Sequence, residues 1–290
     1  MTSNPIQSLP KIYSGKVRDL YDINEQHMLM VASDRLSTFD IILNQTIPNK
    51  GKYLTQISLF WFNKTQHIIT NHLTDIPLNQ YLNKTELDYA NGRALIVKKL
   101  KPLPIEVIVR GYLAGSGYKD YLATGSIGGH KLPAGLQNSQ KLPQTIFTPS
   151  TKAEVGDHDI NISIAQCEKI IGVELTAKIE HIAISLYNYA CELASSKNII
   201  IADTKFEFGL DQNNNLVLMD EILTPDSSRF WDKDTYQIGS NPPSYDKQFV
   251  RDYLEKTIIW DKQPPIPDLP QDVIVNTQEI YHRLVNKFIE

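Results

Sequence analysis

Residues 203–209 of the chain read Asp203-Thr204-Lys205-Phe206-Glu207-Phe208-Gly209. Successive side chains of a β-strand point to opposite faces, so Asp203, Lys205 and Glu207 share one face, and the threonine and phenylalanines share the other. The aromatic face predicts contact with a hydrophobic core. Because three unpaired charges are too costly to bury, the charged face must open to water or to a polar site.

A second strand follows this stretch after a short polar loop. The pattern predicts a hairpin of residues 199–209 and 216–222, with Asp220 roughly opposite Glu207. Two carboxylates on adjacent strands suit Mg²⁺, which takes hard oxygen ligands and shares them with substrate phosphates. Taken alone, these residues leave a second interpretation open, namely a solvated charged face with surface ion pairs.

Towards the N-terminus, the sequence reads mainly as strands and turns. We predict a hairpin of residues 12–21 and 27–33, a further apolar run at 40–47, a buried strand at 94–100 and one helix at 54–69. The prolines of Lys101-Pro102-Leu103-Pro104 stiffen the chain there. We therefore expect an N-terminal, mostly antiparallel lobe over 1–101, a larger α+β lobe over 102–290, and a cleft between them.

The second lobe mixes strands and helices. Residues 105–110 read as a strand, and the glycine-rich stretch 111–135 is expected to be irregular. Ser163 is expected to cap a helix at 164–171, and Thr176 a longer one at 177–196. Further helices are predicted at 245–256 and 272–289. The fold class is therefore α+β.

Composition narrows the classes of function. Hydrophobic residues make up 41% of the 290 residues and charged residues 21%, which is typical of a globular protein and argues against long-range disorder. A net charge of −4 offers no electrostatic footprint for nucleic acid. The two cysteines lack zinc-type spacing, and neither a signal peptide nor a long apolar run is present. We expect a cytoplasmic protein that binds neither nucleic acid nor membrane.

A basic turn near the N-terminus suits phosphate. In Ser14-Gly15-Lys16-Val17-Arg18, the two cations fall on one face, and Gly15 lets the backbone approach a phosphate closely. The pattern is not a Walker A loop, and an exposed basic hairpin is the alternative. The buried strand that ends near Lys99 leads into the stiff connector, where kinase-like folds read adenine. Just beyond, Glu106 could accept hydrogen bonds from ribose hydroxyls.

Three polar segments suit a second substrate. Arg110 ends an apolar strand, where a guanidinium can grip phosphate or carboxylate, and Ser116 follows between two glycines. Lys152 and Asp159 belong to polar loops dense in hydroxyls and charge, and Arg229 lies just after the predicted metal hairpin. The sequence contains no nucleophile elbow and no reactive cysteine setting, so covalent acyl-enzyme chemistry has no support.

Taken together, these segments resemble the SAICAR synthetase (phosphoribosylaminoimidazole-succinocarboxamide synthase) family of purine biosynthesis. The matching blocks occur in order over residues 14–231, about three quarters of the chain. They are Ser14-Gly15-Lys16-Val17-Arg18-Asp19, Ser33-Asp34-Arg35-Leu36-Ser37-Thr38-Phe39-Asp40, Val109-Arg110-Gly111-Tyr112 with Gly115-Ser116-Gly117, Thr148-Pro149-Ser150-Thr151-Lys152-Ala153-Glu154, residues 203–209, and Asp220-Glu221 through Trp231.

The resemblance implies an ATP-dependent ligase. The family joins the carboxylate of 5-amino-1-(5-phospho-D-ribosyl)imidazole-4-carboxylate (the ribotide) to the amine of L-aspartate, giving SAICAR, ADP and phosphate. Phosphorylating a carboxylate creates a good leaving group for amine attack, so positioned cationic and metal charge is expected to do most of the work. The implied ligands are thus ATP, Mg²⁺, the ribotide and L-aspartate.

The resemblance also assigns roles to residues. Ser14, Gly15, Lys16, Val17 and Arg18 would line the ATP phosphates, with Lys99 and Glu106 at the nucleoside, and Glu207 and Asp220 would hold Mg²⁺. The ribotide would meet Arg110, Ser116 and Arg229, with Asp34 and Asp159 near the imidazole or the incoming aspartate. The residues expected to approach the reacting groups are Lys152, Lys205 and Asp203.

Small departures from the family pattern are Tyr118, Thr38 and Asp157, and none is a proposed metal or phosphate ligand. The glycine-rich stretch and the C-terminal helices resemble the longer form of the family, acting as a monomer or homodimer. Two alternatives remain open: a kinase-like phosphotransferase acting on a small metabolite, and a non-catalytic nucleotide sensor. The first predicts ATP turnover without an amine acceptor, and the second predicts ATP affinity without turnover.

Overall fold

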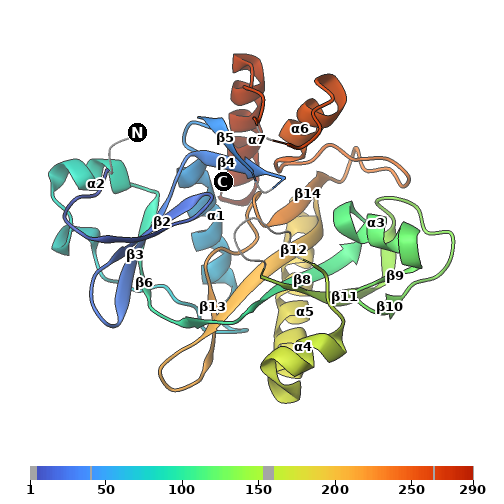
Figure 1. The fold of residues 1–290 in the computed structure, drawn as a ribbon, viewed down its shortest axis with the longest axis horizontal. Coiled ribbons are helices and arrows are strands. Elements are labelled where there is room, and N and C mark those ends of the chain that lie inside the picture. The colour runs from blue at the N-terminus through green and yellow to red at the C-terminus, as the bar shows by residue number, and fades with distance from the viewer. Residues whose placement is uncertain (1–4, 40, 153–159, 264, 290) are drawn as a thin grey trace.

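The computed structural model describes residues 5–39, 41–152, 160–263 and 265–289. Its first sheet has the strand order β1-β2-β3-β6, and all pairs are antiparallel. The strands are β1 (Lys11–Ser14), β2 (Arg18–Asp22), β3 (His27–Ala32) and β6 (Ala94–Lys98). This sheet lies on the left of Figure 1, and the predicted mostly antiparallel N-terminal sheet is confirmed.

One part of that prediction was wrong. Residues 12–21 are not one strand but two, because the chain reverses at Gly15, whose N–H donates to the carbonyl of Arg18 at 2.7 Å. One face of the sheet is covered by the 3-10 turn η1 (Leu78–Gln80) and helix α2 (Lys84–Ala90). These elements share a small core with Tyr21, Leu29 and Ile96. The basic residues thus lie in a tight turn at the sheet's edge.

The second sheet is larger and carries the predicted metal hairpin. Its order is β11-β8-β12-β13, and β14 and β7 also pair with β12. The strands are β7 (Lys101–Pro102), β8 (Ile105–Tyr112), β11 (Lys141–Thr151), β12 (Ile199–Leu210), β13 (Leu216–Met219) and β14 (Ser228–Asp232). The β12–β13 hairpin is confirmed, and Glu207 pairs with Met219, one residue before Asp220.

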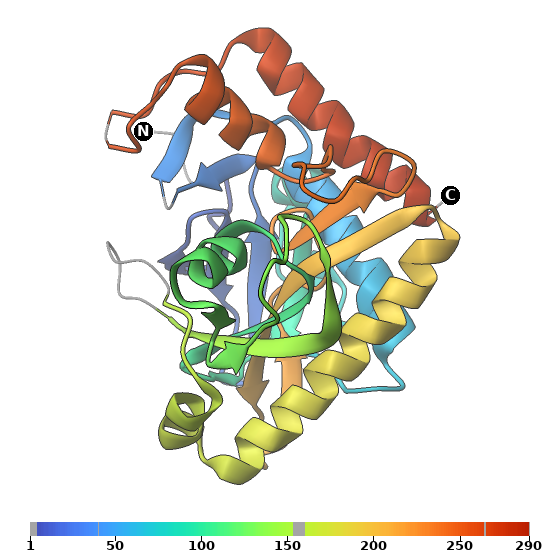
Figure 2. The same cartoon turned by 90° about the vertical axis from the view of Figure 1, so that its right-hand side faces the viewer.

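Helices α4 (Ile164–Ile171) and α5 (Val173–Ser196) lie between β11 and β12 along the chain. Ser163 caps α4 as predicted, in a capping box with Gln166. The predicted cap at Thr176 was wrong, because α5 already begins at Val173 after Gly172 (φ 91°). The Thr176 hydroxyl instead donates to the Gly172 carbonyl at 2.8 Å, inside the first turn. Figure 2 shows α5, in yellow, as a long diagonal helix.

The glycine-rich stretch 111–135 was wrongly expected to be irregular. It contains helix α3 (Gly115–Thr124) and the short strands β9 (Ser126–Ile127) and β10 (His130–Lys131). Tyr121 and Ile127 pack there with Leu113 and Ile146 in a separate small core. These apolar residues fold the segment, while its glycines occupy turns such as Gly125 (φ 69°), which ends α3.

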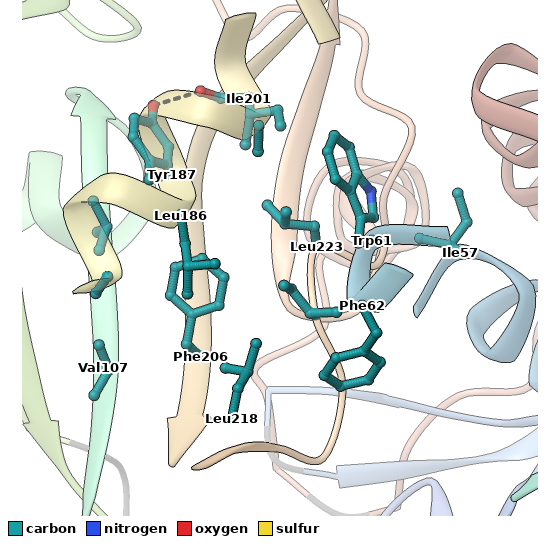
Figure 3. Close-up of a cluster of buried hydrophobic side chains, with 14 of the residues drawn as sticks. Ile57, Trp61, Phe62, Val107, Leu186, Tyr187, Ile201, Phe206, Leu218 and Leu223 are labelled. Carbon is teal, nitrogen blue, oxygen red and sulfur yellow. Dashed lines mark hydrogen bonds between the residues drawn. The ribbon is translucent and has the colours of Figure 1, made fainter. Parts of the chain in front are cut away.

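The main core joins both ends of the chain. Helix α1 (Lys50–Thr65) packs against α7 (Gln271–Ile289). The predicted helix at 272–289 is confirmed, and the one predicted at 54–69 is present but begins and ends four residues earlier. Figure 3 shows Trp61 of α1 beside Leu223 and Phe62 on the side of Leu218, and Phe206 of β12 belongs to the same core, as the aromatic face of 203–209 predicts. The division into two lobes at residue 101 remains a prediction. Helix α1, which precedes that residue, shares the main core with elements that follow it.

A small ribbon, β4 (Arg35–Thr38) and β5 (Ile41–Thr46), stands apart from both sheets. Its buried side chains pack against α6 (Gln248–Asp252), the π-helical turn Tyr253–Thr257 and the start of α7. The predicted helix at 245–256 therefore begins later than expected and widens into the π turn. Within the described ranges, every helix is too short or too polar to cross a bilayer.

Candidate active site

A cleft of about 1490 Å³ is lined by the basic turn, the β12–β13 hairpin, α3 and α6. It collects polar residues from sequence positions 13 to 263. The structure brings together in its lining most of the sequence-predicted site residues. These are Gly15, Lys16, Val17, Arg18, Glu106, Ser116, Lys152, Lys205, Glu207, Asp220 and Arg229.

Five predicted ligands lie outside that lining and contact other groups. The Ser14 hydroxyl donates to Asp19 at 2.7 Å, and Lys99 pairs with Asp22. Asp34 accepts two hydrogen bonds from Arg93 (3.0 and 3.2 Å) and one from the N–H of Gly51 at the start of α1. The remaining two, Arg110 and Asp203, lie behind Arg229. Asp159 lies outside the described residues.

The basic turn is held in shape by Arg35 of β4 and by Ser33, which lies two residues before it. The Val17 carbonyl accepts from the N–H of Ser33 at 2.9 Å and from its hydroxyl at 2.8 Å. Arg35 donates to the carbonyls of Gly15 and Lys16 at 3.0 and 3.1 Å. The sequence analysis considered the turn without partners from elsewhere in the chain. It therefore missed the hydrogen bonds from Ser33 and Arg35, which lie outside the turn.

Two carboxylates meet one arginine on the hairpin side of the cleft. Arg18 approaches Asp220 at 2.5 Å and Glu221 at 2.7 Å. Although burial opposes it, the attraction of these acids raises the pKa of Arg18. Burial raises the pKa of Asp220 to about 6, and repulsion from Glu207 and Glu221 adds to the rise while Arg18 opposes it. The attraction of Arg18 therefore does not fully offset the burial of Asp220 and its repulsion from the neighbouring carboxylates.

Two lysines approach Glu207, namely Lys152, which directly follows β11, and Lys205, which lies on β12 itself. Lys152 lies 2.7 Å from Glu207, and Lys205 lies 3.5 Å from Glu207 and 2.5 Å from Glu106. Burial alone would raise the pKa of Glu207, but the attraction of Lys205 and Lys152 lowers it to about 2. Burial likewise opposes Lys205, yet Glu106 and Glu207 raise its pKa. Lys205 is thus held as a cation between two ionised carboxylates, and Lys152 lies beside one of them.

The donor set fits Mg²⁺ in a shared site. Among the described residues, no three carboxylate, histidine or cysteine side chains are grouped to enclose a metal by themselves. Mg²⁺ commonly binds through one or two carboxylates together with water and substrate phosphates. Glu207 and Asp220 both line the cleft beside the basic turn, which is the arrangement that such sharing requires.

At the other end of the cleft, Asp203 forms ion pairs with two arginines. Its carboxylate lies 2.5 Å from Arg229 and 3.2 Å from Arg110, which also donates to Thr148 at 3.0 Å. A side chain at Gly115 would displace Arg229, because a Cβ there would stand 2.3 Å from its guanidinium. The predicted arginine site is therefore layered, with Arg229 lining the cleft and Arg110 supporting it from behind.

Sequence reasoning missed the contribution of α6. Lys247 and Arg251 line the cleft, and Arg251 donates to the Thr38 hydroxyl at 3.1 Å. Burial lowers the pKa of Lys247 to about 8, and repulsion from Arg251 and Lys50 adds to the fall, although Asp226 opposes it. Neither cation has a carboxylate within 4.0 Å among the described residues. Their spacing of four residues on a helix was the available signal.

Comparisons with known proteins agree with this geometry. Residues 11–267 match the model of the SAICAR synthetase family. The phosphoribosylaminoimidazole-succinocarboxamide synthase of Haemophilus influenzae strain PittGG is 60% identical over 282 residues, covering 97% of each chain. That of Mannheimia succiniciproducens is 61% identical over 279 residues, covering 96% of this chain and 97% of the relative.

Solved structures give the same result. The SAICAR synthase from Saccharomyces cerevisiae complexed with SAICAR superposes with a TM-score of 0.89 at 41% identity, covering 99% of this chain and 97% of that one. A SAICAR synthetase in complex with ADP has a TM-score of 0.70 at 28% identity, covering 95% and 96%. The match in sequence and in fold extends over nearly the whole length of both chains. The chain belongs to the SAICAR synthetase family.

Proposed function

We propose that the cleft joins the carboxylate of the ribotide to the amine of L-aspartate, with conversion of ATP to ADP and phosphate. The observation that carries the proposal is the order of charges along one cleft. A basic turn stands beside paired carboxylates and lysines, and an arginine group lies beyond them. Relatives named as synthases, and solved relatives with ADP and with SAICAR, support this ligase over a phosphotransferase or a sensor.

ATP would bind at the end of the cleft nearest the first sheet. Leu20, Pro102 and Met219 supply apolar surface there for a flat base. Glu106, at the start of β8, is placed to accept from ribose hydroxyls while it pairs with Lys205. The phosphates would then reach the turn at Gly15, where backbone N–H groups and Lys16 favour an anion.

Glu207 and Asp220 would hold Mg²⁺ together with the phosphates. When bound, the ion would neutralise phosphate charge and align the γ-phosphoryl group with its acceptor. Lys152 and Lys205 lie on the same side of the cleft and already contact Glu207. They would stabilise negative charge that develops on the transferring phosphoryl group and on the ribotide carboxylate.

The second half of the cleft would hold the ribotide and L-aspartate. Arg229 and the Ser116 hydroxyl are placed to bind the ribotide phosphate, and Arg110 keeps Ser116 and Asp203 in position at 3.4 and 3.2 Å. Lys247 and Arg251 line the cleft without a described carboxylate within 4.0 Å of either, which suits the remaining carboxylates of the substrates. The proposal keeps the sequence-based prediction of a cytoplasmic monomer or homodimer.

The test is a substrate-dependence assay on the purified chain. ADP release should require both the ribotide and L-aspartate, and mass spectrometry should find the amide product. ATP turnover with a phosphorylated product and no amine acceptor would instead favour the phosphotransferase. ATP binding without turnover under any substrate combination would favour the sensor.

A further inference from the structure

Three successive carbonyl groups of the basic turn accept hydrogen bonds from Ser33 and Arg35. Those of Gly15 and Lys16 accept from the guanidinium of Arg35, and that of Val17 accepts from Ser33. In a planar trans peptide the N–H points opposite to the C=O. The N–H groups of Lys16 and Val17, which share peptide units with the first two carbonyls, therefore point away from Arg35.

This orientation matters for an anionic ligand. A carbonyl oxygen carries partial negative charge and repels a phosphate, whereas an N–H attracts it. Glycine restricts its backbone less than other residues do, so the sequence of the turn does not by itself fix which way the peptide unit after Gly15 points. An external donor that fixes the carbonyls also decides which face the N–H groups present to the cleft.

Arg35 is built to be that donor. Its Nε and Nη2 reach the carbonyls of Lys16 and Gly15, and the same guanidinium lies 2.9 Å from Asp19, whose carboxylate also accepts from Ser14. The adjacent Leu36 is fully buried in the core shared with α6, so β4 provides a firm base. A lysine could not reach two carbonyls and a carboxylate at once, because it lacks the planar fork.

We propose that Arg35 is a positioning residue that turns the carbonyls of residues 15 and 16 away from bound nucleotide and so presents the N–H groups of the turn to its phosphates. The inference rests on the proposed function, in which this turn receives ATP. It predicts an effect on phosphate recognition specifically, whereas a purely structural salt bridge between Arg35 and Asp19 would affect only stability.

The test compares ADP with adenosine, which lacks the phosphates, by calorimetric titration of the full chain with Mg²⁺ present. Arg35→Gln should weaken ADP binding about tenfold, the size of one misaligned charge-assisted contact, and leave adenosine binding unchanged. Arg35→Lys should give an intermediate loss and keeps the measurement informative if the glutamine variant folds poorly. Lys11→Met is the matched control, since Lys11 also pairs with Asp19 (3.3 Å) but contacts no turn carbonyl.

The ratio of ADP affinity to adenosine affinity tests the positioning role of Arg35. An unchanged ratio in both Arg35 variants, or the same fall in ratio in the Lys11 variant, would overturn the positioning role. If the unmodified chain binds ADP no more tightly than adenosine, the phosphate assignment in the proposed function fails, and the positioning role fails with it.

Discussion

Lys50 and Asp226 form an ion pair that is almost wholly removed from water. The Lys50 side chain is 0% exposed and that of Asp226 4%, and their charged atoms lie 2.6 Å apart. The other oxygen of Asp226 accepts from the Tyr281 hydroxyl at 2.7 Å. The pair thus ties the first residue of α1 to α7 and to the loop that leads to Arg229.

We expect Lys50→Met to lower the free energy of unfolding by about 3–5 kcal/mol at pH 7, the usual cost of leaving one member of a buried pair unpaired. Burial opposes ionisation of Asp226, but Lys50 and Lys247 hold its pKa well below its ordinary value. That contribution is present above the ordinary carboxyl pKa and is lost as the pH falls through the lowered one. Neutral pH therefore shows the full effect.

The assay is equilibrium unfolding in urea with a double-mutant cycle. Asp226→Asn alone should also cost about 3–5 kcal/mol, whereas the double variant should be more stable than the sum of the single losses predicts by at least ~2 kcal/mol. Lys52→Met, on the same helix but without an ion pair to the described residues, should change stability by less than about 0.5 kcal/mol. Additive single losses, or a Lys50→Met loss near that of the control, would refute the reasoning.

Three further outcomes follow from the site and the core. Glu207→Gln should raise the Mg²⁺ concentration that half-saturates tight ADP binding by about tenfold or more without unfolding the chain; an unaltered Mg²⁺ dependence would count against this ligand. Arg229→Ala should raise the KM for the ribotide far more than that for ATP, and equal rises would argue against its assignment. Burial lowers the pKa of His72 to about 4, so the unfolded chain takes up a proton below its ordinary pKa near 6.5 and stability falls. Replacing His72 with Gln should flatten the loss between pH 6.5 and 4, on the order of 3 kcal/mol, in unfolding curves recorded across that range.

Local pattern was enough for much of the fold. Alternation in 203–209 predicted which face of β12 meets the core, and Phe206 and Phe208 are buried there as expected. Ser163 was predicted as a cap because capping depends on residues within one turn. The misses have local causes too: glycines hid helix α3, and the reversal at Gly15 broke one predicted strand into two.

The site was predictable in chemistry but not in contacts. Residue type and spacing marked the basic turn, the carboxylates and Arg229 as candidates, and the structure places them in one cleft. Asp34 carried the same kind of signal, yet it contacts Arg93 and the start of α1. The sequence does not show which arginine, distant along the chain, pairs with a given carboxylate. Lys247 and Arg251 were missed because a basic helix face usually points to solvent.

By itself, the sequence determined the charged and aromatic faces of the hairpin, the α+β class and the kinds of ligand the chain can hold, since these depend on residue types a few positions apart. Only the tertiary structure decided that Arg35 fixes the turn of Gly15, that Asp203 stands between two arginines, and that α6 completes the cleft. Each of these contacts joins residues far apart in the chain. Their energy depends on distance and burial in the folded molecule, and neither is encoded in spacing along the sequence.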